Sequence, residues 1–205
     1  GPWGDSGNEM LYSVTYNNGV SKYALRKIPY VPRVLDVSAG IGIPYSEFAV
    51  FNTDATLLER AEAYALSGQY DKAVNDINAE LSVFTKKKTQ LTLDEIVDFY
   101  GSLAYYTPTK PTPKKALNPL FTIEKTTQEP LLQCILQLRR LLTMHEGFRL
   151  QDVKRYGITM YRRQVDVQSN VTAVTDSMKT GDPRLAIQLP QDVISAGVTP
   201  NPRNK

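Results

Sequence analysis

The amino-acid sequence predicts a mainly α-helical fold that carries long irregular loops and one small β-hairpin. Apolar residues recur three and four positions apart between residues 54 and 82 and again between 128 and 145. This spacing places them on one face of a helix, as packing against a core requires. Short alternating runs occur mainly before residue 50. We therefore divide the chain into an irregular, loop-rich segment, residues 1–50, and a helical region, residues 51–205.

Composition excludes several classes of protein. The 205 residues include 41% hydrophobic and 22% charged residues, which is typical of a folded globular chain. A net charge of +3 is too small to indicate a nucleic-acid partner. Cys134 is the only cysteine, so neither an internal disulfide nor a cysteine metal site is possible, and we expect a buried thiol. No apolar stretch is long enough for a membrane span.

The first 50 residues hold one clear strand pattern. Leu11 to Tyr16 has strand character, and the turn signal Asn17-Asn18-Gly19 follows it. Prolines and glycines interrupt the chain after residue 28, which indicates loop with room for one hairpin. Gly40-Ile41-Gly42 lacks the further glycine of a phosphate-binding loop, so we assign it no ligand.

A pair of helices is predicted between residues 54 and 82. Asn52 or Asp54 caps the first helix, and Gly68 ends it. The second helix starts at once, so the two form an αα-hairpin. The spacing of two aromatic residues, a turn glycine and a small residue is similar to that of a tetratricopeptide repeat. These residues are Tyr64, Gly68, Tyr70 and Ala73. No second copy follows at the repeat period, and one repeat alone cannot bury its apolar face.

Further along, Thr92-Leu93-Asp94-Glu95 predicts a capped helix that runs to about residue 103. A loop insertion rich in Pro, Thr and Lys follows at about 107–126, and we expect it to be exposed. The longest helix begins near residue 127, with one or two more helical turns at 149–156. Residues 161–167 alternate like an edge strand, 170–180 are polar and predict a mobile loop, and the tail from Asp182 is irregular.

Catalysis finds little support in the residue types present. The pair His145-Glu146 could suggest a metalloprotease motif, but the second histidine of that motif is missing. His145 is the only histidine in the chain. A single histidine argues strongly against a histidine zinc site, and it leaves a Ser-His pair without a second histidine as a spare base. We therefore predict that the chain is not an enzyme and needs no metal or cofactor.

Tyrosines favour binding over chemistry. The chain has twelve tyrosines against six phenylalanines and one tryptophan. A tyrosine offers a flat apolar face and a polar tip, which suits stacking on a sugar or a peptide. Tyr64 and Tyr70 are expected to pack between helices instead. The candidate ligand-binding residues, in or beside loops, are Trp3, Tyr12, Tyr16, Tyr105 and Tyr106.

Three segments together resemble the C-terminal region of the SusD/RagB family. The first is Leu57-Leu58-Glu59-Arg60-Ala61-Glu62-Ala63-Tyr64-Ala65, with Gly68, Tyr70 and Ala73 after it. The second runs from Arg139-Arg140 through His145-Glu146-Gly147-Phe148-Arg149 and Asp152 to Lys154-Arg155-Tyr156-Gly157. The third joins Leu185–Pro190 and Gln191-Asp192-Val193-Ile194 to Asn201-Pro202. Leu138 and Leu142 replace glutamates that are usual in the family on the long helix.

The resemblance implies a cell-surface nutrient-binding protein of the outer membrane with a tetratricopeptide-like helical scaffold. Such a protein is a lipoprotein anchored through an N-terminal part, and it delivers glycans or peptides to a TonB-dependent transporter of the SusC type. We expect this chain to be the C-terminal portion of such a protein. The alternative is a tetratricopeptide adaptor that binds a protein partner.

The second segment has charges spaced to meet across helical turns. We predict that Glu146, Gly147, Arg149, Asp152 and Arg155 form a structural clasp that fixes the long helix to the helical hairpin.

Overall fold

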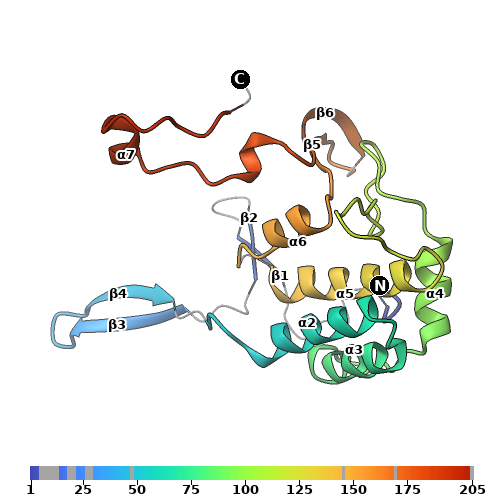
Figure 1. Cartoon of the computed structure of the whole chain (residues 1–205). Coiled ribbons are helices and arrows are strands. Elements are labelled where there is room, and N and C mark those ends of the chain that lie inside the picture. Colours follow the sequence, from blue (N-terminus) through green and yellow to red (C-terminus); the bar gives the residue numbers. More distant parts are fainter. Residues whose placement is uncertain are drawn as a thin grey trace. The chain divides into compact units, whose positions relative to one another are not determined.

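The computed structural model describes residues 1–4, 14–17, 22–25, 30–46, 49–144, 146–168 and 170–203. Their regular structure is mostly helical, with six α-helices and three two-stranded antiparallel sheets among the described residues (Figure 1). The predicted mainly α class is thus confirmed. Two compact units make up the chain: Gly1–Gly101 with Lys125–His145, and Ser102–Glu124 with Glu146–Lys205. Residue 50, where the sequence analysis divides the chain, lies within the first unit.

The first unit is built on three helices. They are α2 (Thr53–Leu66), α3 (Tyr70–Phe84) and α5 (Gln128–Leu142), and α4 (Leu93–Ser102) completes the helical part. α2 and α3 form the predicted hairpin, and α5 packs on α2 and with fewer residues on α3 (Figure 1). The apolar face of the hairpin is therefore covered by a helix from much later in the sequence, without a second repeat.

Local signals place the ends of α2 as the sequence predicts. Asn52 rather than Asp54 is the cap, since its Oδ1 accepts a hydrogen bond of 2.7 Å from the amide of Ala55. At the other end Gly68 has φ +75°, and its amide donates to the carbonyl of Ala65. The next amide, of Gln69, donates to the carbonyl of Tyr64 at 2.9 Å. This pair of bonds is a Schellman motif, which requires a left-handed residue and so favours glycine.

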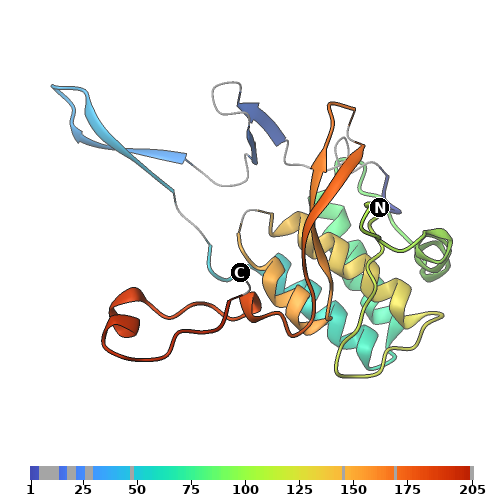
Figure 2. The same cartoon turned by 90° about the horizontal axis from the view of Figure 1, so that it is seen from above.

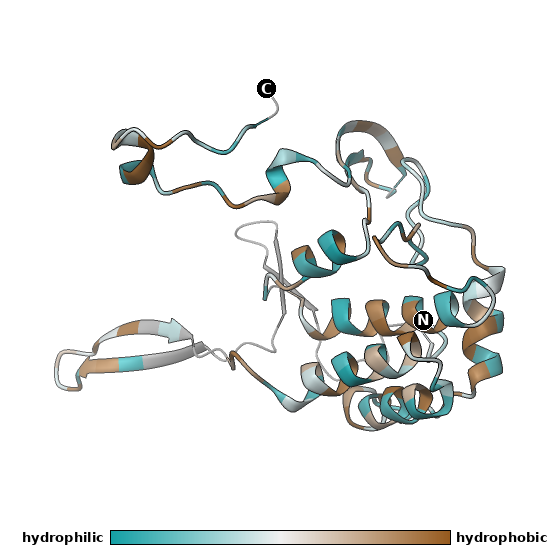
Figure 3. Ribbon diagram, in the orientation of Figure 1, coloured by the Kyte–Doolittle hydropathy of each residue, from teal (hydrophilic) through white to brown (hydrophobic). Residues whose placement is uncertain are grey.

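The core of the first unit lies between these helices. Figure 3 shows hydrophobic residues as bands along α4 and α5. The fully buried side chains include Leu58, Ala61, Ile77, Leu81, Ile96, Tyr100, Leu131, Leu132, Ile135 and Leu138. Each buried Leu or Ile contributes about 1.5–3 kcal/mol relative to an exposed one, so this cluster is the main stabilising element of the unit.

Polar contacts at both ends of α5 fix it to α2. The Gln128 side-chain amide donates to the carbonyl of Ala65 at 2.9 Å, where α2 ends. Near the other end of α5, the guanidinium of Arg139 forms an ion pair with Glu62 and donates to the carbonyl of Leu58. Both charged side chains of the pair are almost buried, 12% exposed for Arg139 and 9% for Glu62. The long helix is therefore held in register by contacts to α2 in its own unit.

Cys134 lies in α5 and is completely buried, as expected. Burial raises the pKa of its thiol to about 12, although a hydrogen bond with Tyr100 acts in the opposite direction. Because the thiolate is the reactive form, we expect an aromatic disulfide reagent at neutral pH to label the folded protein at least about a thousandfold more slowly than the unfolded chain. Equal labelling rates before and after denaturation would contradict this burial.

Two hairpins occupy the first segment where one was predicted. β1 (Val14–Asn17) pairs with β2 (Lys22–Leu25), and β3 (Tyr30–Asp36) pairs with β4 (Ile41–Ser46). The second hairpin was missed because prolines break the strand pattern. Pro32 lies opposite Pro44 in it, and every strand of a two-stranded sheet is an edge strand, where a proline costs no ladder bond on its outer side.

The second unit consists of an irregular segment, one helix, one hairpin and the tail. Its elements are α6 (Arg149–Arg155), β5 (Met160–Val165), β6 (Val171–Met178), the 3₁₀ turn η1 (Pro183–Leu185) and α7 (Gln191–Ser195). Figure 2 shows β5 and β6 as a twisted two-stranded ribbon. The predicted mobile loop at 170–180 is therefore wrong, because β-branched residues of Val171-Thr172-Ala173-Val174-Thr175 pair with the predicted edge strand.

None of the helices in the described part of the chain is both long enough and apolar enough to span a membrane.

Candidate functional site

Three of the five candidate ligand-binding residues, Trp3, Tyr12 and Tyr16, belong to the first unit. Trp3 is only 2% exposed and its ring lies against Gly1, so no face of the indole is available for stacking. An indole is largely apolar, and burial is its favoured environment even near a chain end. Tyr12 lies outside the described residues. Tyr16 belongs to β1, and its side chain also lies outside what the structure describes.

Tyr105 and Tyr106 lie in the second unit, in the irregular segment after α4. Here the chain folds back on itself, since the amide of Tyr106 donates to the carbonyl of Lys114 at 2.8 Å. The hydroxyl of Thr112 closes the same loop through a bond of 2.9 Å to the carbonyl of Ala104. This segment was predicted as an exposed loop, but Lys115 and Leu117 are buried in it. Its shape is therefore held by hydrogen bonds despite the absence of helix or strand.

Tyr106 packs against a tyrosine from β5. The rings of Tyr106 and Tyr161 are stacked, with centroids 5.5 Å apart and planes 30° apart. Arg163 follows Tyr161 on the same face of β5, because side chains alternate along a strand. Its guanidinium lies 4.2 Å from the centroid of the Tyr106 ring. Residues more than 50 positions apart thus meet around one ring.

Arg163 also ties the loop to the strand. Its Nε donates to the carbonyl of Pro108 at 2.7 Å, and its terminal nitrogens donate to the carbonyl of Thr107 and the hydroxyl of Tyr106. A planar guanidinium fork can satisfy several acceptors at once, which a lysine cannot do in a fixed geometry. In this way Arg163 supplies hydrogen bonds to backbone carbonyls of the loop that have no partner in a helix or strand.

Two lysines complete the arrangement. The ammonium of Lys115 lies 3.5 Å from the centroid of the Tyr106 ring and donates to the carbonyl of Thr112 at 2.6 Å. Lys114 extends over the neighbouring ring, with its Nζ 4.5 Å from the centroid of Tyr105. Tyr105 is 41% exposed. An ammonium above an aromatic face is attracted by the ring's quadrupole, so these contacts are cation–π interactions.

We call these six residues the tyrosine–cation cluster. Its members are Tyr105, Tyr106, Lys114, Lys115, Tyr161 and Arg163. Residues 102–123 and β5 contain no acidic residue at all. The cluster has apolar ring faces and positive charge but no histidine, carboxylate or activated nucleophile for acid–base or covalent chemistry. Such a surface can bind a ligand through stacking and through charge.

The residues of the predicted tetratricopeptide-like motif are structural. Ala73 is fully buried, and Gly68 makes the turn. Tyr64 is half-buried, with Lys72 and Arg60 over its ring at 5.4 and 6.0 Å. Tyr70 is the first residue of α3. Gly68 and Ala73 thus shape the hairpin, and both tyrosines are half-buried on it.

Arg60 and Glu62 of the same motif point to different helices. Arg60 binds Asp76 of α3 through two hydrogen bonds, of 2.7 and 2.9 Å. Glu62 binds Arg139 of α5. Two residues along a helix turn by about 200°, so the two charges necessarily lie on nearly opposite sides of α2. One short motif therefore fastens α2 to both of its neighbours.

The predicted clasp residues lie at the beginning of Glu146–Lys205, the second stretch of chain in the second unit. Arg149 and the buried Asp152 form an ion pair of 3.2 Å within α6. Arg155 is exposed and lies 5.2 Å from the ring of Phe121. Gly147 has φ +84° with open space around it, so its backbone conformation and not crowding favours glycine. That these residues and Glu146 fix α5 to the hairpin stays a prediction.

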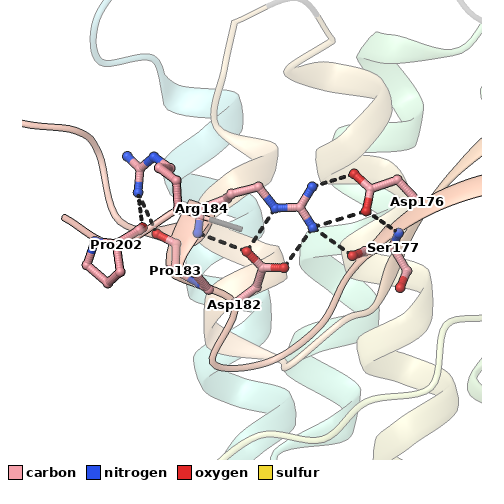
Figure 4. A network of polar contacts seen from close by, with 7 residues as sticks. Asp176, Ser177, Asp182, Pro183, Arg184 and Pro202 are labelled. Carbon is pink, nitrogen blue, oxygen red and sulfur yellow. Dashed lines mark hydrogen bonds and ion pairs between the residues drawn. The ribbon is translucent and has the colours of Figure 1, made fainter. Parts of the chain in front are cut away.

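The tail contains a polar network that sequence reasoning missed. Arg184 binds Asp182 and Asp176 and donates to the carbonyl of Ser177 at 2.7 Å (Figure 4). Arg203 binds the carbonyls of Pro183 and Pro202. The sequence signal that could have predicted this network is Asp182-Pro183-Arg184, which follows a strand. The aspartate caps the turn by accepting from the amide of Arg184, and the arginine side chain can extend back to the strand.

This network makes the tail sensitive to acid. The Arg184 guanidinium, hydrogen-bonded to the Asp182 carboxylate, lowers the pKa of Asp182 from 3.8 to about 2. A group with a lowered pKa in the folded state stabilises it above its unfolded pKa. The contribution is therefore complete above about pH 4 and is lost as the pH falls toward 2. We expect NMR titration of the Asp182 carboxyl to show this, with faster amide exchange at 176–186 below about pH 3. Asp182→Asn should abolish this pH dependence; an ordinary pKa for Asp182 would refute it.

Only two of the six residues of the cluster were candidates from the sequence. Tyr105 and Tyr106 were candidates, while Lys114, Lys115, Tyr161 and Arg163 were not. The alternation of Tyr161 and Arg163 on one face of an expected strand was a usable signal. Lys114 and Lys115 gave no usable signal, because the residues that surround a lysine in a proline-rich loop depend on how the loop folds back.

The described part of the chain is thus mainly helical, and the tyrosine–cation cluster lies in its second unit. In the described residues no group of three or more His, Cys, Asp or Glu side chains is placed to hold a metal ion. Comparison of the chain with protein-family models, curated proteins and solved structures gave no match.

Proposed function

We propose that this chain is the C-terminal portion of a SusD/RagB-like protein that binds nutrients at the cell surface without catalysis. Its ligand would be a glycan or oligosaccharide, or else a peptide. The ligand would pass to a TonB-dependent, SusC-like transporter in the outer membrane, where a lipid on the N-terminal part anchors the protein. The helical scaffold is then of the tetratricopeptide-like kind.

The observation that carries the proposal is the ion pair between Glu62 and Arg139. The resemblance to the family rests on separate sequence segments, and these two residues belong to the first and the second. Chance similarity in two segments gives no reason for them to meet. Here they meet in one helical unit, through a nearly buried pair between α2 and α5. The contact between the first two segments therefore supports the view that they belong to one family pattern.

The third segment supports the same reading within the second unit. Gln188 belongs to its first part and Asn201 to its last. The side chain of Gln188 exchanges two hydrogen bonds with the backbone of Asn201, of 2.9 and 3.1 Å, and the Asn201 side chain donates to the carbonyl of Ile187. This segment contains only a 3₁₀ turn and a short helix, so its regular structure alone stabilises one conformation weakly. The hydrogen bonds from side chains to the backbone add the stabilisation that holds it in that conformation.

The test is a binding screen with the whole chain. We expect an array of oligosaccharides and short peptides to give reproducible binding to a restricted class of them, with no turnover of the bound material. A SusC-like transporter expressed together with the protein should co-purify with it. A protein that ignores glycans and peptides but captures a folded partner would be an adaptor of the tetratricopeptide type, and the proposal would fall. Turnover of a bound ligand would also overturn it.

A further inference from the structure

We infer that the tyrosine–cation cluster is a glycan-binding site and that its ligand is an acidic glycan, carrying uronate or sulfate groups. This inference rests on the proposed function, because it names the class of ligand that the nutrient-binding protein takes. It starts from the charge and the exposure of the cluster.

Positive charge in this part of the second unit is not offset locally. Residues 102–123 carry three lysines and β5 carries two arginines, without one carboxylate. Across the β5–β6 hairpin, Asp176 lies opposite Arg162, but its carboxylate is bound to Arg184. The cations of the cluster therefore create a positive potential that favours an anionic ligand.

The cations of the cluster divide into two kinds. Lys115 and Arg163 are tied to backbone carbonyls and to the Tyr106 ring, so their role is to hold the loop. Lys114 is different. Within the described part of the chain, its Nζ has no hydrogen bond to an oxygen acceptor, and it lies 4.5 Å from the centroid of the Tyr105 ring. A cation–π contact leaves the three N–H donors of a lysine available to an anion.

Tyr105 supplies the complementary surface for a sugar. Its ring is 41% exposed beside the Lys114 ammonium. An apolar ring face next to a cation matches a pyranose that has a C–H face and a charged substituent. A neutral glycan would use the ring and leave the ammonium to water. An acidic glycan uses both.

The rest of the cluster acts as a rigid support. The half-buried ring of Tyr106 contacts Tyr161, Arg163 and Lys115, and its amide donates to the carbonyl of Lys114. A loop that is already ordered loses less entropy when a ligand binds. The surface formed by Tyr105 and Lys114 is thus preorganised by residues that need not touch the ligand.

The experiment compares acidic and neutral glycans on the whole chain. An array should carry uronate-containing and sulfated oligosaccharides beside their neutral or methyl-esterified counterparts. We expect acidic members to bind, and their esterified counterparts to bind about tenfold or more weakly. Raising NaCl from about 50 to about 500 mM should weaken binding, because exposed charges are screened.

Variants then locate the site. Lys114→Gln should weaken binding of the best acidic glycan by about tenfold, and Tyr105→Leu by a similar factor. Lys72→Gln is the matched control, since Lys72 also lies over a tyrosine, Tyr64, but on the helical hairpin. It should leave the affinity unchanged. Circular dichroism of each variant checks that the fold is retained.

Each outcome decides the inference. Preference for neutral glycans, or normal affinity in a folded Lys114→Gln variant, would overturn it and leave the proposed function standing. Binding of single-stranded DNA as tight as that of the acidic glycan would overturn it too, as unspecific attraction. No binding of glycan or peptide of any kind would overturn both proposals.

Discussion

Replacing Glu62 with alanine should lower the free energy of unfolding of the first unit by about 3 kcal/mol. Glu62 and Arg139 are 9% and 12% exposed at their side chains, so little water replaces the missing carboxylate. The loss of one partner leaves a charge near the core, which costs more than the intact pair contributes. Urea denaturation followed by far-ultraviolet circular dichroism measures the change.

Glu59→Ala is the matched control for this experiment. Glu59 is an exposed glutamate on the same helix, so the same substitution should change the free energy by less than about 0.5 kcal/mol. A double variant, Glu62→Met with Arg139→Met, should recover much of the stability that Glu62→Ala loses. It removes both charges and keeps apolar volume at the contact. Equal costs for Glu62→Ala and Glu59→Ala would show that the pair is not buried in solution.

The helices could be predicted from the sequence because their signals are local. Asn52 begins α2, and the capping box of Thr92 and Glu95 begins α4, with the Thr92 amide donating to Glu95 at 2.7 Å. Gly68 separates α2 from α3. Each signal depends on neighbours within four residues, so a single sequence contains all the information needed.

The strands were harder to predict because their partners decide them. Residues 170–180 are polar enough to resemble a loop, and β6 leaves half of its eight side chains exposed and the other half only partly covered. Its pairing with β5 supplies the hydrogen bonds, and Asp166 holds the connecting turn by accepting from the amides of Gln168 and Asn170. A hairpin without a buried face gives only a weak period-two pattern, and the prediction failed there.

The candidate site shows the same division. That tyrosines beside loops are suited to binding follows from residue type alone, and Tyr105 and Tyr106 were chosen on that basis. Which cations surround them depends on contacts between the loop and β5, more than 50 residues away. Trp3 was a candidate ligand-binding residue on the same basis, and its side chain is buried. An aromatic residue can pack in a core or bind a ligand at the surface, and only the fold shows which of these two roles it has.

The second large effect is expected in the other unit, at Gly157. Its φ is +57°, a left-handed conformation that costs an alanine about 1–2 kcal/mol. A Cβ there would also lie 2.3 Å from the carbonyl oxygen of Asn118 and 2.9 Å from its carbon. Both are backbone atoms, so neither can move aside like the end of a flexible side chain. The irregular segment therefore requires glycine for two independent reasons.

Gly157→Ala should consequently destabilise the second unit by about 3 kcal/mol, the sum of the strained backbone and the overpacked contact. The amide of Asn118 donates to the carbonyl of Tyr156 at 2.8 Å, so its hydrogen exchange reports directly on this junction. We expect that amide to lose most of its protection in the variant. Gly68→Ala separates the two causes, because Gly68 has φ +75° but no atom within 4 Å of a Cβ. It should cost only about 1 kcal/mol, and equal costs at both positions would mean that the close approach to Asn118 is absent.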